Sequence, residues 1–364
     1  MGRKKINLSI VAISVALLSG CGGGSSSSSS DDSMDLYNIC AKSDSDIDKP
    51  TLYCATDCQS DVVVGYSGGD KDECEAEASE WLDSFTHSDV TATQEQQDAI
   101  DWLNVKREAM GLAKFHSNEK LEQATLNHEN YLNDVWYKYS VNMTHYEDNE
   151  NYPSDYYTGY SGVDRAEYTG YDGYGVGEVI SYMNNDIQSS IDGLLTAIYH
   201  RLALFARGTN QIGIGGTQHN FAYPHLMGYN GDRYDYLLAM SNDIVTYPYA
   251  NQDDFQTTFI VHNESPDPMP NADEDMGNPI SISFNGGDIE LVSFKVYDSN
   301  NNELDSYDAL TSDNDDSGFI DDRTFVLFTK VPYESNSTYN VVFKYKRDGK
   351  DNELKWSFKT RDEE

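Results

Sequence analysis

The sequence contains little positive charge. Its 364 residues include 25 Lys and Arg against 62 Asp and Glu, which gives a formal net charge of −37. A chain of this charge repels the phosphates of nucleic acid, so we expect no nucleic-acid partner. The same repulsion disfavours direct docking on an anionic bilayer. Because the acidic residues are spread over the whole chain, we interpret them as a solubilising surface.

Long apolar runs are also scarce. The clear one, residues 10–18, follows the basic residues 3–5 and is too short for an ordinary membrane-spanning helix. A basic start before a short apolar segment is typical of a secretory signal. We therefore interpret residues 1–20 as a signal peptide that is removed on export. Residues 21–35, rich in Gly and Ser, form a flexible tether with nothing to bury.

The end of this signal carries a motif. The letters LLSGC, residues 17–21, resemble the lipobox of bacterial lipoproteins. The resemblance implies cleavage before Cys21 and lipid on its thiol and new amino group. Several acyl chains anchor a protein stably, so the predicted membrane partner is the bilayer that holds this anchor. Gly22 after the cysteine favours the outer membrane or cell surface, as in lipoproteins generally. A plain signal peptide with a chance cysteine is the alternative.

Cysteine is rare and clustered. Apart from Cys21, the chain has four cysteines, all within the small region 36–90: Cys40, Cys54, Cys58 and Cys74. In an exported chain, four such residues predict two disulfides, with three possible pairings. The spacing of CATDC also suits zinc, but an oxidising location favours disulfides. No free thiol remains, and no Ser stands in a nucleophile-elbow motif, so covalent nucleophilic catalysis is disfavoured.

The central region, residues 91–250, has helical periodicity followed by strand-like runs. We predict helices over 93–112, with a capping box at Thr93 and Gln96, and over 118–136, where His128 falls on the apolar stripe as a buried structural histidine. A third helix is expected over 191–206. Strands are predicted at 210–216 and 236–243. Helices and strands in this order predict a layered α/β domain.

The C-terminal region changes to a period of two. Three prolines at every second residue, 266 to 270, predict a stiff linker over 251–275. Residues 276–364 contain alternating runs such as PISISF and TYNVVFKY, separated by turn sequences. This pattern predicts an all-β sandwich of immunoglobulin type.

Histidines and carboxylates of the central region supply the chemical signal. His145 and Glu147 occur in NMTHYED, Glu178 occurs in GVGEVIS, and His200 occurs in AIYHR. His200 follows Ile198 by two residues, so it projects away from the apolar stripe of its predicted helix. Each residue alone is a weak signal.

Together and in this order, these segments resemble the CAP superfamily in its bacterial SCP-domain form, over about residues 95 to 245. The first predicted helix carries the matching Asn104, Arg107, Gly111 and Leu112. The resemblance implies a three-layer α-β-α sandwich with an open cleft. In that cleft it places His145, His200 and Glu178, with His200 turned toward the other two.

The resemblance also implies a second glutamate before the second histidine, where this chain offers only Asp192 as an acidic residue. Val179 also replaces the usual Asn of the Gly-Glu-Asn motif. Glu147 is our candidate for the fourth group. Two imidazoles and a carboxylate suit a divalent metal, with zinc favoured and calcium or magnesium as alternatives. Without metal, a His–Glu pair among His145, Glu178 and His200 could act as a general base.

Three functions follow from these features. The first is a cell-envelope lipoprotein whose His/Glu cleft binds a divalent metal and a ligand, which could be a peptide, a glycan or a lipid. The second is a metal-assisted peptide hydrolase. The third is an adhesion module without catalysis, in which the tyrosine-rich segment 152–182 forms the contact surface. A covering loop packed over the core is the structural alternative for that segment.

Overall fold

The computed structural model describes eleven segments: residues 37–41, 52–59, 62–67, 71–72, 74–76, 78, 92–142, 144–182, 184–216, 222–229 and 243–362. The predicted signal peptide, Cys21, the tether and residues 236–242 of the predicted strand 236–243 lie outside them. Residues 36–364 form one compact unit. Within the described segments, no helix is long and apolar enough to cross a membrane.

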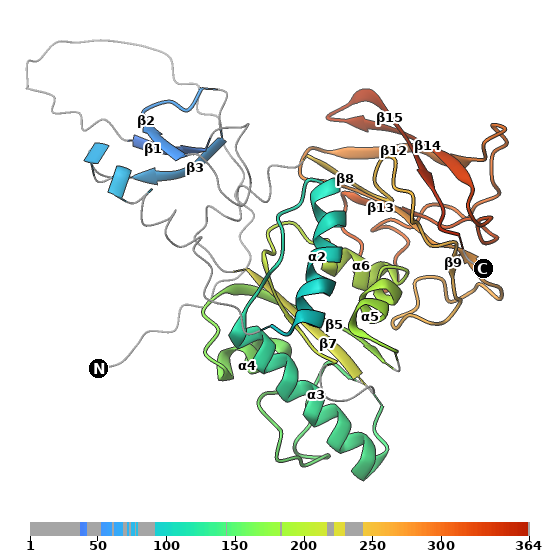
Figure 1. Cartoon of the computed structure of the whole chain (residues 1–364). Helices are drawn as coiled ribbons and strands as arrows, with labels where there is room; N and C mark the ends of the chain where they lie inside the picture. The colour runs from blue at the N-terminus through green and yellow to red at the C-terminus, as the bar shows by residue number, and fades with distance from the viewer. Residues whose placement is uncertain are drawn as a thin grey trace, which may run out of the picture. The chain divides into compact units, whose positions relative to one another are not determined.

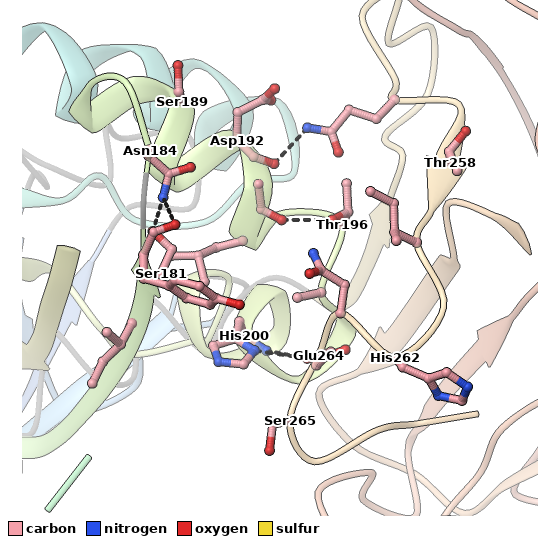
Figure 2. A pocket seen from close by; sticks show the side chains of 18 of the residues that line it. Ser181, Asn184, Ser189, Asp192, Thr196, His200, Thr258, His262, Glu264 and Ser265 are labelled. Carbon is pink, nitrogen blue, oxygen red and sulfur yellow. Dashed lines mark hydrogen bonds and ion pairs between the residues drawn. The ribbon is translucent and has the colours of Figure 1, made fainter. Parts of the chain in front are cut away.

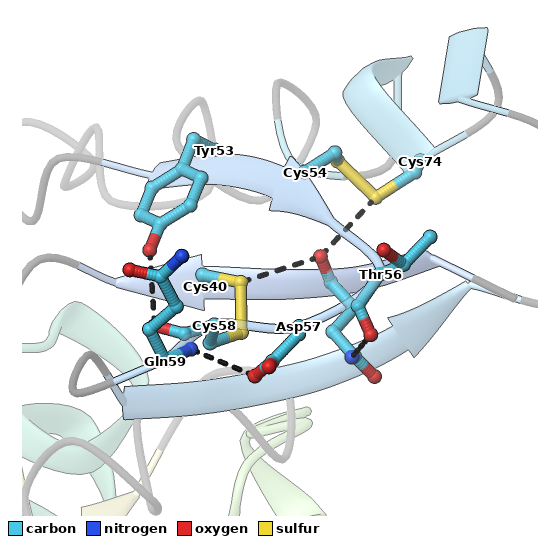
Figure 3. The surroundings of a disulfide bond; sticks show 9 residues. Cys40, Tyr53, Cys54, Thr56, Asp57, Cys58, Gln59 and Cys74 are labelled. Atoms are coloured by element: carbon cyan, nitrogen blue, oxygen red, sulfur yellow. Dashed lines mark hydrogen bonds between the residues drawn. A yellow bond between two sulfur atoms is a disulfide. The ribbon is translucent and has the colours of Figure 1, made fainter.

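The cystine-rich region is a small antiparallel sheet held by two disulfides (Figure 3). Strand β1 (Tyr37–Ala41) pairs on one side with β2 (Leu52–Ala55) and on the other with β3 (Val62–Ser67). The bridges join Cys40 to Cys58 and Cys54 to Cys74, which confirms two disulfides and selects one of the three pairings. In the same region, residues 74–76 and 78 are helical. Each bridge closes a short loop of the chain, and closing a loop of this size stabilises the folded state by about 3 kcal/mol.

The central region has three layers, as predicted (Figure 1). Its sheet has the order β4-β6-β7-β5, with bounds His116–Ser117, Gln211–Ile214, Ala222–Tyr229 and Tyr174–Tyr182. Strand β4 runs parallel to β6, and the other pairs are antiparallel. One face packs against α3 (Glu119–Tyr139) and α4 (Gly162–Tyr168). The other face packs against α2 (Gln94–Ala109), α5 (Ile187–Leu194) and α6 (Ile198–Leu204).

Local sequence signals explain the first two helices. The Thr93 hydroxyl accepts from the Gln96 amide at 3.3 Å, and the Gln96 side chain accepts from the Thr93 amide at 2.7 Å. This is the predicted capping box, which satisfies two of the free amides at the start of α2. On α3, His128 is fully buried, as its place on the apolar stripe predicts.

The prediction of one helix over 191–206 is wrong. The segment forms two helices, α5 and α6, because the chain turns at residues 195–197 and Ala197 is extended, with φ −78° and ψ 111°. Ala197 has no side chain that could cap α6. The carboxylate of Glu264, distant in sequence, caps the helix instead. Tertiary contact has therefore decided where this helix begins.

The C-terminal region is a sandwich of two antiparallel sheets. One has the order β13-β11-β8, with bounds Thr324–Leu327, Ile280–Phe284 and Ile244–Tyr247. The other has the order β12-β14-β15, with bounds Ile289–Tyr297, Thr338–Arg347 and Lys350–Lys359. In chain order these strands match A-B-E and C-F-G of an immunoglobulin-type sandwich. At the start of β14, the Tyr339 hydroxyl accepts from the Glu334 amide at 2.8 Å, as in a tyrosine corner.

The sandwich begins earlier than the sequence pattern indicates. Strand β8 lies inside the range 91–250 expected for the α/β domain, yet it pairs with β11. The expected linker 251–275 is also structured. It contains β9 (Thr258–Phe259), which pairs with β10 (Met276–Gly277), and Phe255 bridges to Thr360.

The α/β layers and the sandwich share a hydrophobic core. Val179 and Leu204 belong to the same buried cluster as Phe255 and Ile280. Polar contacts reinforce it: fully buried Arg201 on α6 donates to the Pro279 carbonyl oxygen at 2.7 Å. The segment that follows β8 is therefore fixed beside α5 and α6.

Candidate functional site

His145 and Glu178 form the first half of the site. His145 lies in the loop after α3, and its Nδ1 is 3.0 Å from Oε2 of Glu178 on β5. The His145 side chain is 43% exposed, whereas that of Glu178 is 5% exposed. A buried carboxylate therefore holds an accessible imidazole.

Basic groups from both helices of the adjacent layer surround Glu178. Arg165 on α4 donates to Glu178 Oε1 at 2.6 Å, and His128 Nε2 on α3 is 3.7 Å from Oε2. Burial raises the pKa of Glu178, but the charges of His128 and Arg165 and the bond from His145 outweigh it and lower the pKa to about 2. Glu178 is therefore ionised at neutral pH, with both oxygens engaged.

Glu147, our candidate fourth group, lies elsewhere. Its side chain is fully buried, with Oε1 2.9 Å from His128 Nδ1 and Oε2 accepting from the Thr158 amide at 2.9 Å. Arg165 Nε is 3.7 Å from Oε1. Glu147 therefore helps to hold His128 and Arg165 in position. The structure does not bring it beside His145 and His200.

His200 and Glu264 form the second half of the site (Figure 2). His200 lies in the first turn of α6, and its Nδ1 is 2.9 Å from Glu264 Oε1. The same carboxylate accepts from the amides of Ile198 and Tyr199, both at 2.7 Å, and of His200 at 3.3 Å. Glu264 has no exposed side-chain surface. It caps α6 and orients His200 at once.

The two histidines face each other. Their ring centroids are 6.4 Å apart and the ring planes differ by 30°. A carboxylate can only accept a hydrogen bond, so each Nδ1 carries the proton and Nε2 is the basic nitrogen of each neutral ring. The site thus contains two similar pairs, Glu178–His145 and Glu264–His200, and each pair leaves Nε2 available.

Two cavities meet at this histidine pair. The larger, about 1040 Å³, lies between the end of β5, α5 and the segment 256–265 (Figure 2). The smaller, about 360 Å³, lies between the first half of β5, the start of α4 and α6. His145, His200 and Ser265 line both cavities. The histidines therefore stand at the middle of a long cleft.

Comparison with known proteins concerns the central region. Residues 100–222 match the model of the CAP family, described as the cysteine-rich secretory protein family. This part of the chain is a CAP domain. Among solved structures, an extracellular protein containing an SCP domain from Bacillus anthracis str. Ames is similar at 19% identity and a TM-score of 0.31. The match covers 37% of this chain and 40% of that one. No curated protein matches the sequence.

The side chains that could coordinate a metal ion in the cleft are a test of the metal hypothesis. In the described part of the chain, no group of three or more His, Cys, Asp or Glu side chains is arranged to hold a metal ion. Glu178 and Glu264 are engaged by other partners, which leaves two imidazoles. Two imidazoles on one tetrahedral zinc have centroids roughly 5 Å apart, so the observed rings would need to approach by about 1 Å. If a metal were bound here, the two imidazoles would be its protein ligands, with the carboxylates in the outer sphere.

Two features escaped the sequence analysis. Glu264 lies 64 residues after His200 in a segment predicted to be a linker, and no spacing connects the two. A polar chain also runs inward from the cleft: Ser181 Oγ is 2.6 Å from Ser190 Oγ, which is 2.9 Å from Nε2 of fully buried His225. Burial lowers the pKa of His225 to about 3, so the ring is neutral and a weak base.

Proposed function

We propose that this protein is an exported, lipid-anchored binding protein of the bacterial envelope whose CAP-domain cleft holds a ligand at His145 and His200. The observation that carries the proposal is the pair of imidazoles, each held through Nδ1 by its own buried carboxylate. Such support fixes ring orientation and makes Nε2 a better donor to a metal or acceptor from a ligand. Groups fixed in this way bind without first losing side-chain freedom.

A divalent metal would be held by Nε2 of His145 and Nε2 of His200. Imidazole nitrogens favour zinc over calcium or magnesium, which prefer oxygen. When bound, the ion would supply a Lewis acid for an oxygen of the ligand. In this arrangement Glu178 and Glu264 accept hydrogen bonds from Nδ1 of the two imidazoles and do not contact the metal. Arg165 keeps Glu178 charged. Without metal, the same nitrogens can accept hydrogen bonds from the ligand directly.

Export and anchoring rest on the N-terminal region. Two disulfides favour an oxidising compartment, and the signal-like start with Cys21 favours lipidation and an outer-membrane or surface location. Intact-mass measurement of the membrane-extracted protein tests this part of the proposal. We expect a chain that starts at Cys21 and carries acyl chains, and Cys21→Ala should release the protein into the soluble fraction.

Zinc titration of the purified ectodomain by calorimetry tests the site. We expect one zinc per chain, and loss of binding in the double variant His145→Ala/His200→Ala. His262→Ala is the matched control, because this imidazole lines the larger cavity but pairs with Asp267. Glu178→Gln and Glu264→Gln should weaken zinc binding by about 10- to 100-fold. Equal zinc affinity in the wild type and the double histidine variant would disprove the metal site.

Peptide hydrolysis is a second candidate, favoured by the histidine–carboxylate pairs in an open cleft. A neutral imidazole whose Nδ1–H is held by a carboxylate is suited to take a proton from water. The test is cleavage of a peptide library with and without chelator. Cleavage that persists in His200→Ala would rule out this role for the pair.

Adhesion is favoured by a different observation. Five tyrosines between residues 146 and 168 are exposed: Tyr146, Tyr156, Tyr157, Tyr160 and Tyr168. Rigid aromatic groups give large contact areas at low entropic cost. Binding to cells or glycans that survives the histidine substitutions but not Tyr156→Ser/Tyr157→Ser would favour this function.

A further inference from the structure

Strand β5 forms an edge of the CAP sheet. In the order β4-β6-β7-β5, and among the strands that the structure describes, it pairs only with β7, through residues 174–182. The side of an edge strand that faces away from its neighbour presents unpaired backbone N–H and C=O groups. Those groups are able to pair with another extended chain.

The cleft follows this edge. Val176, Glu178 and Val179 line the smaller cavity, and Ile180, Ser181 and Tyr182 line the larger. Successive side chains of a strand point to opposite faces, so a cavity on one face would be lined by alternate residues. Here consecutive residues line the cleft, as expected for a cleft along the edge itself.

Two neighbouring residues strengthen this argument. The Val179 side chain is buried in the core shared with α5, whereas Ile180 is buried against α3 on the opposite face. They are 1% and 2% exposed, yet both line a cavity. Because their side chains are buried on opposite faces, we infer that they meet the cleft through backbone atoms.

The two ends of the cleft differ in chemistry. Beside the smaller cavity lie apolar groups, including Val163, Ala203 and Phe319; Val163 is 46% and Phe319 61% exposed. Most of the side chains that line the larger cavity are polar or charged, among them Asn184, Thr196 and Gln256. A ligand that spans the cleft therefore meets an apolar end and a polar end, with the histidine pair between them.

We propose that the ligand is an extended peptide that adds as a strand to the free edge of β5. This assignment rests on the proposed function of the cleft and names its ligand class. Residues 176–182 extend over roughly 20 Å, enough for about six peptide residues. The backbone of the peptide pairs with β5, an apolar side chain enters the smaller cavity, and a central peptide group lies at the histidine pair.

Backbone pairing gives a direct test. The probe is a positional-scanning library of fluorescein-labelled hexapeptides, read by anisotropy on the full ectodomain. We expect binding of members with an apolar residue toward one end. N-methylation of the best member should weaken binding about tenfold at alternate positions and leave the intervening positions unaffected. A uniform effect of N-methylation along the peptide would overturn pairing with β5.

Amide hydrogen exchange locates the peptide. We expect alternate amides of residues 176–182 to exchange quickly in the free protein and to become protected when the best hexapeptide is added. The proposal would be overturned if the hexapeptide protected no amides of β5, or if it protected only residues 146–168, where the exposed tyrosines lie. The proposal would also be overturned if the protein bound glycan probes but no hexapeptide.

Substitutions separate this proposal from the metal site. Val163→Glu and Phe319→Glu should each weaken hexapeptide binding about tenfold, because an apolar contact is replaced by a charge. Val292→Glu, at a 54% exposed position on β12, is the matched control and should have no effect. All three variants should keep wild-type zinc affinity. Zinc binding without hexapeptide binding rejects the peptide and keeps the histidine site, whereas hexapeptide binding without zinc rejects the metal alone.

Discussion

Removing the Glu264 carboxylate should destabilise the protein, because this group satisfies the start of α6. Three amide groups donate to it, from Ile198, Tyr199 and His200, and His200 adds its ring Nδ1. The helix has no cap of its own at Ala197. In Glu264→Ala all four donors lose this acceptor.

The magnitude follows from the type of each contact. Loss of a helix N-cap typically costs about 1–2 kcal/mol, and a hydrogen bond to a charged group contributes about 1.5–3 kcal/mol. These contributions overlap, and water in the adjoining cavity can reach the freed amides. We therefore expect Glu264→Ala to lower the free energy of unfolding by about 3 kcal/mol. Glu264→Gln should lose about half of that, because one amide oxygen can still accept.

Urea unfolding followed by tryptophan fluorescence measures this loss. Glu303→Ala is the control, because Glu303 is 48% exposed in a surface pair with Lys295 and should change stability by under about 0.5 kcal/mol. If Glu264→Ala unfolds at the same urea concentration as Glu303→Ala, the carboxylate is not the cap of α6, and its support of His200 fails with it.

Three further predictions test other parts of the structure. Arg201→Met should lower the free energy of unfolding by about 3 kcal/mol in urea, because it leaves the carbonyl oxygens of Leu195 and Pro279 without their buried donor. His225 should make stability depend on pH. Burial lowers the pKa of His225 to about 3, whereas its pKa in the unfolded chain is near 6.5. Between these pH values the unfolded state binds a proton that the folded state does not. The free energy of unfolding therefore falls as the pH falls. Between pH 7 and pH 5 this contribution is about 2 kcal/mol, and His225→Asn should remove it from the urea midpoints measured at the two pH values. Finally, a chain that ends at residue 250 should lack a cooperative thermal transition by calorimetry, because the α/β layers share their core with Phe255 and Ile280; a sharp transition would show that the CAP domain folds alone.

Helices governed by local sequence were predictable. The start of α2 depends on a capping box that spans four residues, Thr93 to Gln96, and α3 depends on a regular apolar stripe, so both helices are encoded in nearby residues. The break between α5 and α6 was not predictable in this way. No proline stands at residues 195–197, and the group that caps the new start comes from residue 264.

The same distinction applies to the sheets and disulfides. The alternating pattern identified β11 and β14 as strands, but the partner of β8 depends on tertiary packing. Four cysteines predicted two bridges, and spacing could not choose Cys40–Cys58 over the other partners of Cys40. Patterns along the chain define elements, whereas pairing depends on contacts between distant residues.

The candidate site was predictable only through family resemblance. Nothing in their spacing brings His145, Glu178 and His200 together, yet the structure places them in one cleft. Glu147 was inferred from its closeness in sequence to His145. Although Glu147 lies only two residues after His145, its carboxylate points to His128.

The position of Glu264 makes the sandwich part of the site. The segment that carries it is held by pairing with the last strand region: the Phe255 amide donates to the Lys359 carbonyl oxygen at 3.2 Å, and the Arg361 amide donates to that of Phe255 at 2.8 Å. The Arg361 guanidinium then binds Asp192 on α5, at 2.7 and 2.9 Å. A sandwich domain that served only to hold the CAP domain away from the membrane would need none of these contacts with α5 and α6. Because the carboxylate that orients His200 belongs to a segment fixed by the sandwich, the geometry of the histidine pair depends on both parts of the chain.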